Sequence, residues 1–257
     1  MRSNHEKSGE RRISPRWWDR QEDLAKSFME TREASGAVGT LIAIAGQHPS
    51  IEGIYPNEEY RIRLDTAIEL AQGIAVGGGK ADFATLSSRL IDEDTKIADK
   101  VALADAGAAY LISQGINPQN THSEWNERYK GDEGVYTGGD EAFVVARAFQ
   151  DNPEYRDLIF VLSPGQMGRA RLNFTANGVY PKLRFPEAID TVTQHHSNWL
   201  KNTGYIIYTR LLDPDWQGSS RMGAYARKLR MPSDGVGSQI PFEQLVELYK
   251  QRYPLPN

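Results

Sequence analysis

The chain has 257 residues, a net charge of −4 (30 basic against 34 acidic side chains) and no cysteine. Its length fits one large domain or a domain with an appendage, because single hydrophobic cores rarely exceed about 250–300 residues. Without cysteine there is no disulfide framework, no thiolate metal site and no thiol nucleophile. The near-neutral balance predicts no broadly basic surface for nucleic acid. Any chemistry must come from oxygen, imidazole, guanidinium or backbone groups.

The amino-terminal segment is polar and charged, and we expect residues 1–15 to form a flexible tail. The segment has no apolar run of signal-peptide type, and no stretch of the chain reaches the ~20 apolar residues that cross a bilayer. We therefore expect a cytoplasmic protein without a membrane partner. An amphipathic pattern from Arg16 to about Ser35 predicts the first helix, and Gly36 ends it.

Short apolar segments and amphipathic segments alternate along the middle of the chain. The predicted strands are Thr40–Gly46, Gly73–Gly79, Asp157–Ser163 and Tyr180–Pro186. The predicted helices are Arg61–Gln72, Lys100–Ile116, one from about Asp140, and one within Pro164–Val179. Residues 81–99 are expected to form a polar excursion, and those from Thr121 to Gly139 a loop. This alternation favours a doubly wound α/β fold, a Rossmann-like and mainly parallel sheet with helices on both faces.

The pattern changes after Pro186, where aromatic-rich helical segments replace the alternation. We therefore expect a tail over 1–15, a core with an amino-terminal helix over 16–186, and a helical extension packed on that core over 187–257. Within the extension, His195 and His196 are adjacent, so a helix directs them apart and they do not share one ion easily. With no HExxH motif and no Asp-rich loop, we expect no metal.

Ligands of open parallel sheets bind at the carboxyl ends of the strands. Four loops of small or polar residues are predicted at that edge, and glycine there lets backbone N–H groups approach an anion closely. They predict a nucleotide-like or anionic ligand. The candidate binding residues are Gly46, Gln47, Gly77, Gly78, Gly79, Lys80, Thr137, Ser163, Gln166 and Arg169.

The GGGK segment that ends at Lys80 lacks the Walker A pattern, and no GxGxxG follows a strand. Its lysine is either a point charge for an anion or an exposed side chain after a tight turn. Asp140 and Glu141 stand at a helix start, where carboxylates cap free N–H groups. As an alternative, either of them binds a ligand hydroxyl or acts as a catalytic general base.

Arginine side chains supply the expected anion contacts. Arg169 lies one turn into the helix after Ser163, where a guanidinium holds a phosphate or carboxylate in bidentate fashion, or else forms an ion pair. Arg61 or Arg63 is expected to point to the same edge, with Asp65 as a partner.

The loops, taken in order, resemble the YdcF-like family, a bacterial domain of unknown function shared with SanA and ElyC. The matching segments are LIAIAGQ, RLDTAIEL, VGGGK and VLSPGQMGRARLNFTANGV, within about Thr40 to Pro186. Three positions depart from the family pattern: Gln166 stands where many members have histidine, Gly77 replaces a serine, and Glu141 stands near an expected asparagine.

The resemblance implies a Rossmann-like sheet with a ligand crevice and, as in soluble relatives, S-adenosylmethionine as the ligand. The main hypothesis is therefore a small-molecule-binding protein. An alternative is a hydrolase or transferase that acts on a phosphorylated or amino-acid-derived metabolite in envelope or specialised metabolism, with Asp140 or Glu141 as the acid–base group. A third hypothesis is a non-catalytic protein that binds a partner through its aromatic carboxyl-terminal part.

Overall fold

The computed structural model describes residues 15–46, 56, 58–87, 102–131, 134–135 and 138–186. Its helices are α1 (Pro15–Ala34), α2 (Glu58–Val76), α3 (Leu103–Ser113), α4 (Trp125–Lys130), α5 (Gly138–Asp151) and α6 (Met167–Ala176). Its strands are β1 (Gly39–Ile44), β2 (Lys80–Thr85), β3 (Thr121–His122), β4 (Tyr155–Val161) and β5 (Lys182–Arg184). The predicted extension over 187–257, and all but the last residue of the predicted tail, lie outside the described residues.

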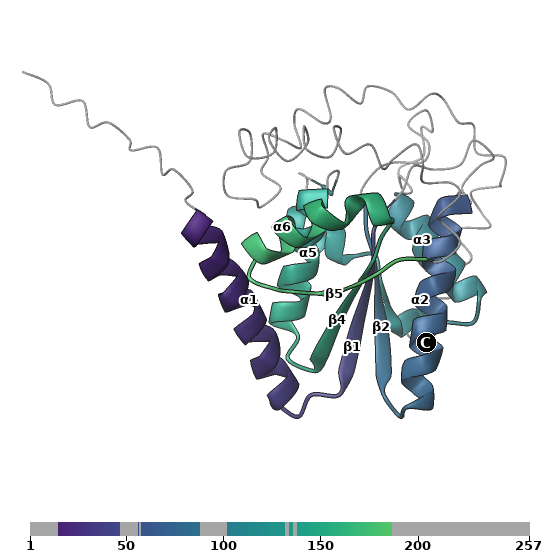
Figure 1. Ribbon diagram of the computed structural model, residues 1–257. Coiled ribbons are helices and arrows are strands. Elements are labelled where there is room, and N and C mark those ends of the chain that lie inside the picture. The colour runs from purple at the N-terminus through teal and green to yellow at the C-terminus, as the bar shows by residue number, and fades with distance from the viewer. Residues whose placement is uncertain are drawn as a thin grey trace, which may run out of the picture.

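The strands form one parallel sheet in the order β3-β2-β1-β4-β5 (Figure 1). The chain builds from β1 outward to β3 and then returns to the other side of β1 to add β4 and β5. The strand order therefore reverses between β1 and β4, and a crevice opens at such a point in doubly wound sheets. The predicted α/β, Rossmann-like fold is confirmed.

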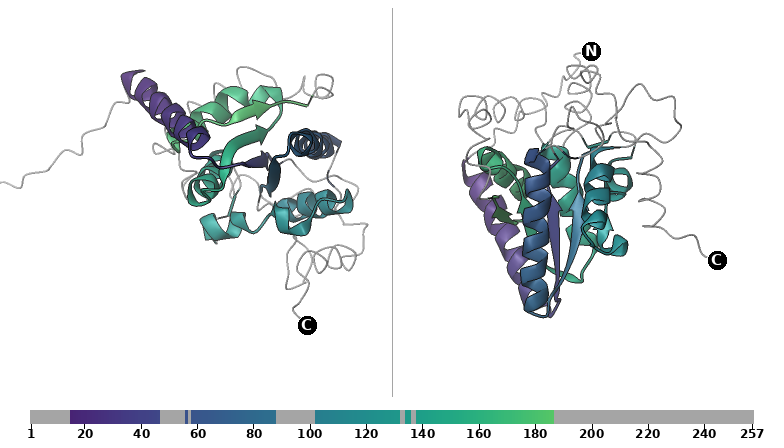
Figure 2. Two further views of the ribbon diagram at one scale, coloured as in Figure 1. Left: turned by 90° about the horizontal axis from the view of Figure 1, so that it is seen from below. Right: turned by 90° about the vertical axis from the view of Figure 1, so that its right-hand side faces the viewer.

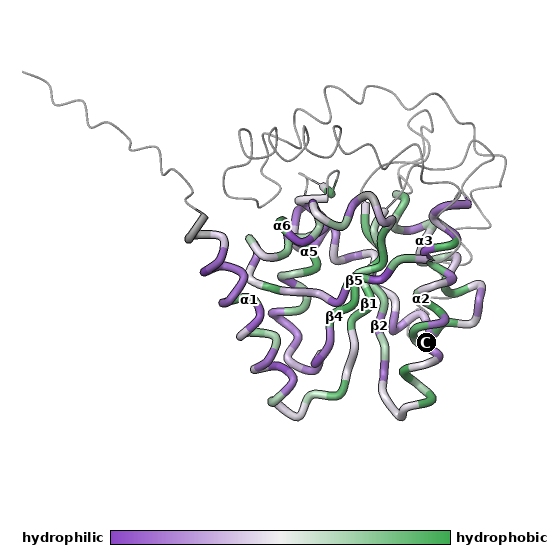
Figure 3. Tube along the Cα trace, viewed as in Figure 1, coloured by the Kyte–Doolittle hydropathy of each residue, from purple (hydrophilic) through white to green (hydrophobic). Residues whose placement is uncertain are grey.

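Helices cover both faces of the sheet, because alternate residues of the two central strands point to opposite sides (Figure 2). Leu41 of β1 and Leu158 of β4 belong to a core that also contains residues of α1, α4, α5 and α6. Ile42 and Val161 point the other way and pack with residues of α2 and α3. Hydrophobic residues accordingly gather in the central strands, whereas α1 is largely hydrophilic (Figure 3).

The predicted strand over Gly73–Gly79 is wrong. Residues up to Val76 continue α2, Gly77 and Gly78 form a turn, and β2 begins at Lys80, in the segment expected to be a polar excursion. Gly78 adopts a φ of 77°, and the Gly79 N–H donates to the Ile74 carbonyl at 3.0 Å, which closes the last turn of the helix. A short apolar run such as GIAV does not distinguish a helix end from a buried strand.

Two further elements lie where a loop was expected. Strand β3 extends the sheet through the pairs Phe83 with Thr121 and Ala84 with His122. Helix α4 follows it, and its Trp125 is buried in the core beside α5. Among the described residues, no helix is long and apolar enough to span a membrane.

Candidate functional site

The carboxyl ends of β1 and β4 lie side by side, since Ile44 pairs with Val161 at the end of the parallel register. Two predicted site residues stand two positions after these strand ends, Gly46 after β1 and Ser163 after β4. Helix α2 begins at the same edge of the sheet, so its first two turns face these strand ends (Figure 1). We call this cluster at the switch point of the sheet the rim site.

Arg63 links both strands of the rim site and is completely buried. Its Nη1 donates to the carbonyl oxygens of Ala45, at 3.0 Å, and of Gly46, at 3.1 Å. Its Nη2 donates to the Glu59 carboxylate and to the Ser163 hydroxyl, both at 2.6 Å. The Ser163 hydroxyl in turn donates to the same Glu59 oxygen at 2.5 Å. One guanidinium thus holds the ends of β1 and β4 in a fixed relation.

This network forms because Glu59 and Arg63 are four residues apart on α2, which places them on one face of the helix. Desolvating a guanidinium is costly unless a charge and hydrogen bonds compensate it. Here Glu59 supplies the charge, and the two backbone carbonyls and Ser163 supply acceptors. At the base of the rim site, the buried positive charge of Arg63 is therefore compensated by Glu59 and by hydrogen bonds.

Glu141, in the first turn of α5, is the titratable group best suited to chemistry at this site. Its Oε1 accepts a hydrogen bond from the Gly46 N–H at 3.0 Å. Withdrawal of the carboxyl from solvent raises its pKa to about 7, although the Gly46 N–H and the charges of Arg63 and Arg169 oppose the shift. A carboxyl group with a pKa near neutrality is able both to accept and to donate a proton at pH 7.

Asp140, the other predicted acid–base residue, forms an ion pair with Lys130 of α4 at 3.0 Å, and both side chains are almost entirely buried. This contact ties α4 to the start of α5 and accounts for a buried carboxylate at that position. We therefore retain Glu141 as the candidate proton-transfer group.

Arg169 and Gln166 lie beside the rim site, as expected. Gln166 ends the short 3-10 turn Pro164–Gln166, and Arg169 stands in the first turn of α6; both are partly exposed. The Nε of Arg169 lies 3.6 Å from the point where a Cβ on Gly138, the first residue of α5, would stand. Its positive charge also reaches Glu141, where it lowers the pKa.

The predicted placement of the GGGK segment at this edge is wrong. Gly77, Gly78 and Gly79 precede β2, and Lys80 is its first residue, so all four lie at the amino end of the strand. The prediction failed because it placed the strand before the glycines rather than after them. Gln47 and Thr137 lie outside the described residues.

Sequence reasoning missed Glu59 and assigned the wrong partner to Arg63. Asp65 instead accepts a hydrogen bond from the Tyr110 hydroxyl at 2.7 Å. The spacing along the helix distinguishes the two candidate partners. Asp65, two residues from Arg63, points away from it, whereas Glu59, four residues away, lies on the same face of the helix.

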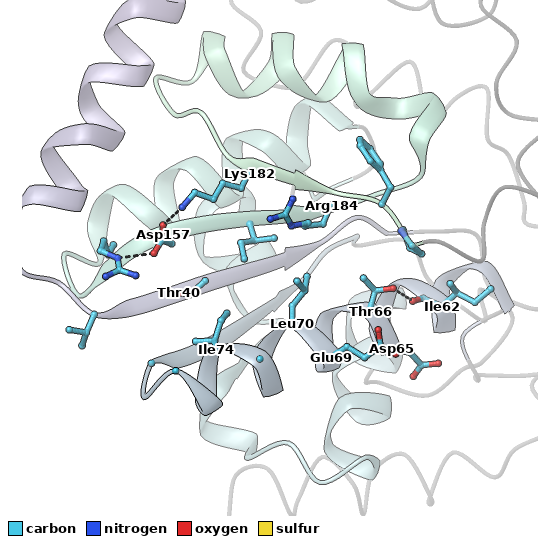
Figure 4. Close-up of a pocket in the computed structure, with 18 residues that line it drawn as sticks. Thr40, Ile62, Asp65, Thr66, Glu69, Leu70, Ile74, Asp157, Lys182 and Arg184 are labelled. Atoms are coloured by element: carbon cyan, nitrogen blue, oxygen red, sulfur yellow. Dashed lines mark hydrogen bonds and ion pairs between the residues drawn. The ribbon is translucent and has the colours of Figure 1, made fainter.

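A separate groove of about 1020 Å³ crosses the sheet face between α2 and β5 (Figure 4). Gly77 and Gly79 line its end near the amino ends of the strands, and Arg184 lines it from β5. Its Asp157 is already paired with Lys182 at 2.5 Å. We place the candidate site at the rim, where buried charged groups converge on the switch point, rather than in this groove.

In the part of the chain that the structure describes, no group of three or more His, Asp or Glu side chains is arranged to hold a metal ion. Comparisons with protein-family models, with curated proteins and with solved structures found no match to this chain.

Proposed function

We propose that the protein binds a nucleotide-like or anionic small molecule at the rim site, and that S-adenosylmethionine is the first ligand to test. The observation that supports this most is the convergence of Glu141, Arg63 and Ser163 at the switch point between β1 and β4. Doubly wound sheets place nucleotide ligands at this point. The resemblance to the YdcF-like family supports the choice of S-adenosylmethionine.

Calorimetric titration of the full chain with S-adenosylmethionine, ATP and NAD tests this proposal. We expect at least one of them to bind with a Kd below about 1 mM, which corresponds to about 4 kcal/mol. Arg169→Gln should weaken that binding roughly tenfold, because it removes a charge-assisted contact. Arg171→Gln is the matched control, since Arg171 is an exposed arginine two residues along the same helix. No binding of any of the three ligands to the wild type counts against the proposal, and equal affinity of the two variants counts against the contact assigned to Arg169.

A second candidate function, a hydrolase or transferase, is favoured by one observation, the pKa of about 7 at Glu141. In this reaction class Glu141 takes a proton from an attacking water or hydroxyl group and returns it to the leaving group. A screen of phosphorylated and amino-acid-derived metabolites should find turnover by the wild type. Glu141→Gln should reduce the rate about 100-fold or more, the usual contribution of a general acid or base. Equal turnover by both proteins would exclude the assigned role.

A further inference from the structure

Asn173 of α6 is an exception among the buried polar side chains. The residue is completely buried. Within the described part of the chain, neither its side-chain oxygen nor its side-chain nitrogen has a hydrogen-bond partner. Buried polar atoms are nearly always paired, because each unpaired atom retains the cost of losing its water. An amide left unpaired at both atoms is therefore one of the structure's clearest indications of a missing partner.

The Asn173 amide faces the start of α5. Its Nδ2 lies 3.6 Å from the point where a Cβ on Gly138 would stand, the same distance as the Nε of Arg169. Gly138 is the first residue of α5 and is partly exposed. Because Gly138 has no side chain, this point at the helix start is unoccupied by the residue itself, and a guanidinium nitrogen and an amide nitrogen both lie 3.6 Å from it.

The chemistry around Gly138 suits a negatively charged oxygen group. The first N–H groups of an α-helix have no acceptor within the helix, and the helix dipole makes this end positive. Arg169 adds a full positive charge and a planar set of donors. The negative charge of Asp140, two residues further along α5, is compensated by Lys130, whose Nζ lies 3.0 Å from the Asp140 Oδ1.

We infer that Gly138, Arg169 and Asn173 form an oxyanion subsite of the rim site, which takes the phosphate or carboxylate group of the ligand. Arg169 binds the anion through its guanidinium, the helix start supplies backbone N–H groups, and Asn173 donates its amide N–H to the same group. The inference rests on the proposed function and specifies it, because it requires an anionic group on the ligand. It also gives the Asn173 Nδ2, one of the two unpaired atoms of this amide, a hydrogen-bond acceptor.

Inorganic phosphate and acetate are the probes, so that the subsite is tested without the rest of any ligand. Melting temperatures of the full chain are measured against the concentration of each anion, with sodium chloride holding the ionic strength constant. We expect the melting temperature of the wild type to rise saturably with at least one probe. A rise with phosphate alone indicates that the subsite takes a tetrahedral group, and a rise with acetate alone indicates that it takes a carboxylate. Arg169→Gln should raise the apparent Kd roughly tenfold, and Arg171→Gln should leave it within about twofold because its side chain is exposed and lies two residues from Arg169.

Asn173→Leu separates a binding role from a structural defect. Removing an unsatisfied amide should leave the melting temperature without anion at or above that of the wild type, while the response to phosphate or acetate is lost. An Asn173→Leu protein that melts higher and responds fully shows that Asn173 is only an unpaired buried amide, and overturns the inference. Asn173→Asp keeps the shape and should also abolish the response by repelling the anion. A response in Arg169→Gln equal to that of the wild type indicates an adventitious ion only and likewise overturns the inference.

The test of the oxyanion subsite and the test of the proposed function can give different results. Phosphate or acetate binding with no binding of S-adenosylmethionine, ATP or NAD retains the subsite and rejects those three ligands. Binding of one of the three that Asn173→Leu and Arg169→Gln leave unchanged retains the proposed function and rejects the subsite.

Discussion

Replacement of Glu141 by Gln is the most direct test of the environment at the rim site. The pKa of the Glu141 carboxyl is raised from 4.5 to about 7 because the group is withdrawn from solvent. The folded state therefore holds this proton more tightly than the unfolded chain does. Between about pH 4.5 and pH 7 the unfolded chain releases the proton first, so the wild type loses stability as the pH rises through this range.

The expected size of the effect follows from the two pKa values. Each pKa unit corresponds to about 1.4 kcal/mol, and linkage over the range from pH 5 to pH 8 gives a loss of about 2.5 kcal/mol attributable to Glu141. Glutamine is close to isosteric and does not titrate. Its side-chain oxygen is able to accept the hydrogen bond that the Gly46 N–H now donates. The variant should therefore lack this part of the pH dependence while keeping the local contact.

Urea unfolding of both proteins at pH 5, 6, 7 and 8 measures the difference, because the other titrating groups are common to both. Relative to the wild type, Glu141→Gln should gain about 2.5 kcal/mol of stability between pH 5 and pH 8. Glu69→Gln, which removes an exposed carboxylate on α2, is the control. The difference in free energy of unfolding between this variant and the wild type should vary little with pH. If the Glu141→Gln difference is equally flat, burial does not perturb Glu141 and the argument for proton transfer fails.

Two further predictions concern the packing that supports the site. Arg63→Leu should lower the free energy of unfolding by about 3–5 kcal/mol in urea, because Glu59 stays buried without its counter-charge; a loss below about 1 kcal/mol contradicts the bridging role of Arg63. Gly107→Ala places a Cβ 2.3 Å from the Tyr60 hydroxyl and should lower the melting temperature, at a cost of about 1–3 kcal/mol. Gly73→Ala, in α2 with no atom within 4 Å of the new Cβ, should instead stabilise the protein by about 0.5–1 kcal/mol. Equal effects of the two alanines would show that the space at Gly107 is not limiting.

Local patterns in the sequence were sufficient for the fold class and for the principal strands. The apolar segments that became β1 and β4, and the glycine after α3, are signals within a few residues of each other. Glu141 was identifiable as well, because a carboxylate in the first turn of a helix after a glycine pair is a local feature. The position of β2 was predicted wrongly throughout, because the apolar residues before Gly77 are equally compatible with the end of α2.

The sequence by itself determined the α/β class and the strands β1 and β4, and with them the edge of the sheet where Gly46 and Ser163 lie. Only the tertiary structure decided which residues meet there. The spacing of four residues between Glu59 and Arg63 is a local feature of α2, but only packing against the ends of β1 and β4 brought this pair to Ala45, Gly46 and Ser163. The pKa of Glu141 and the unpaired amide of Asn173 depend on exclusion of water by segments distant in sequence. Burial is a property of the assembled fold, so no local pattern specifies it.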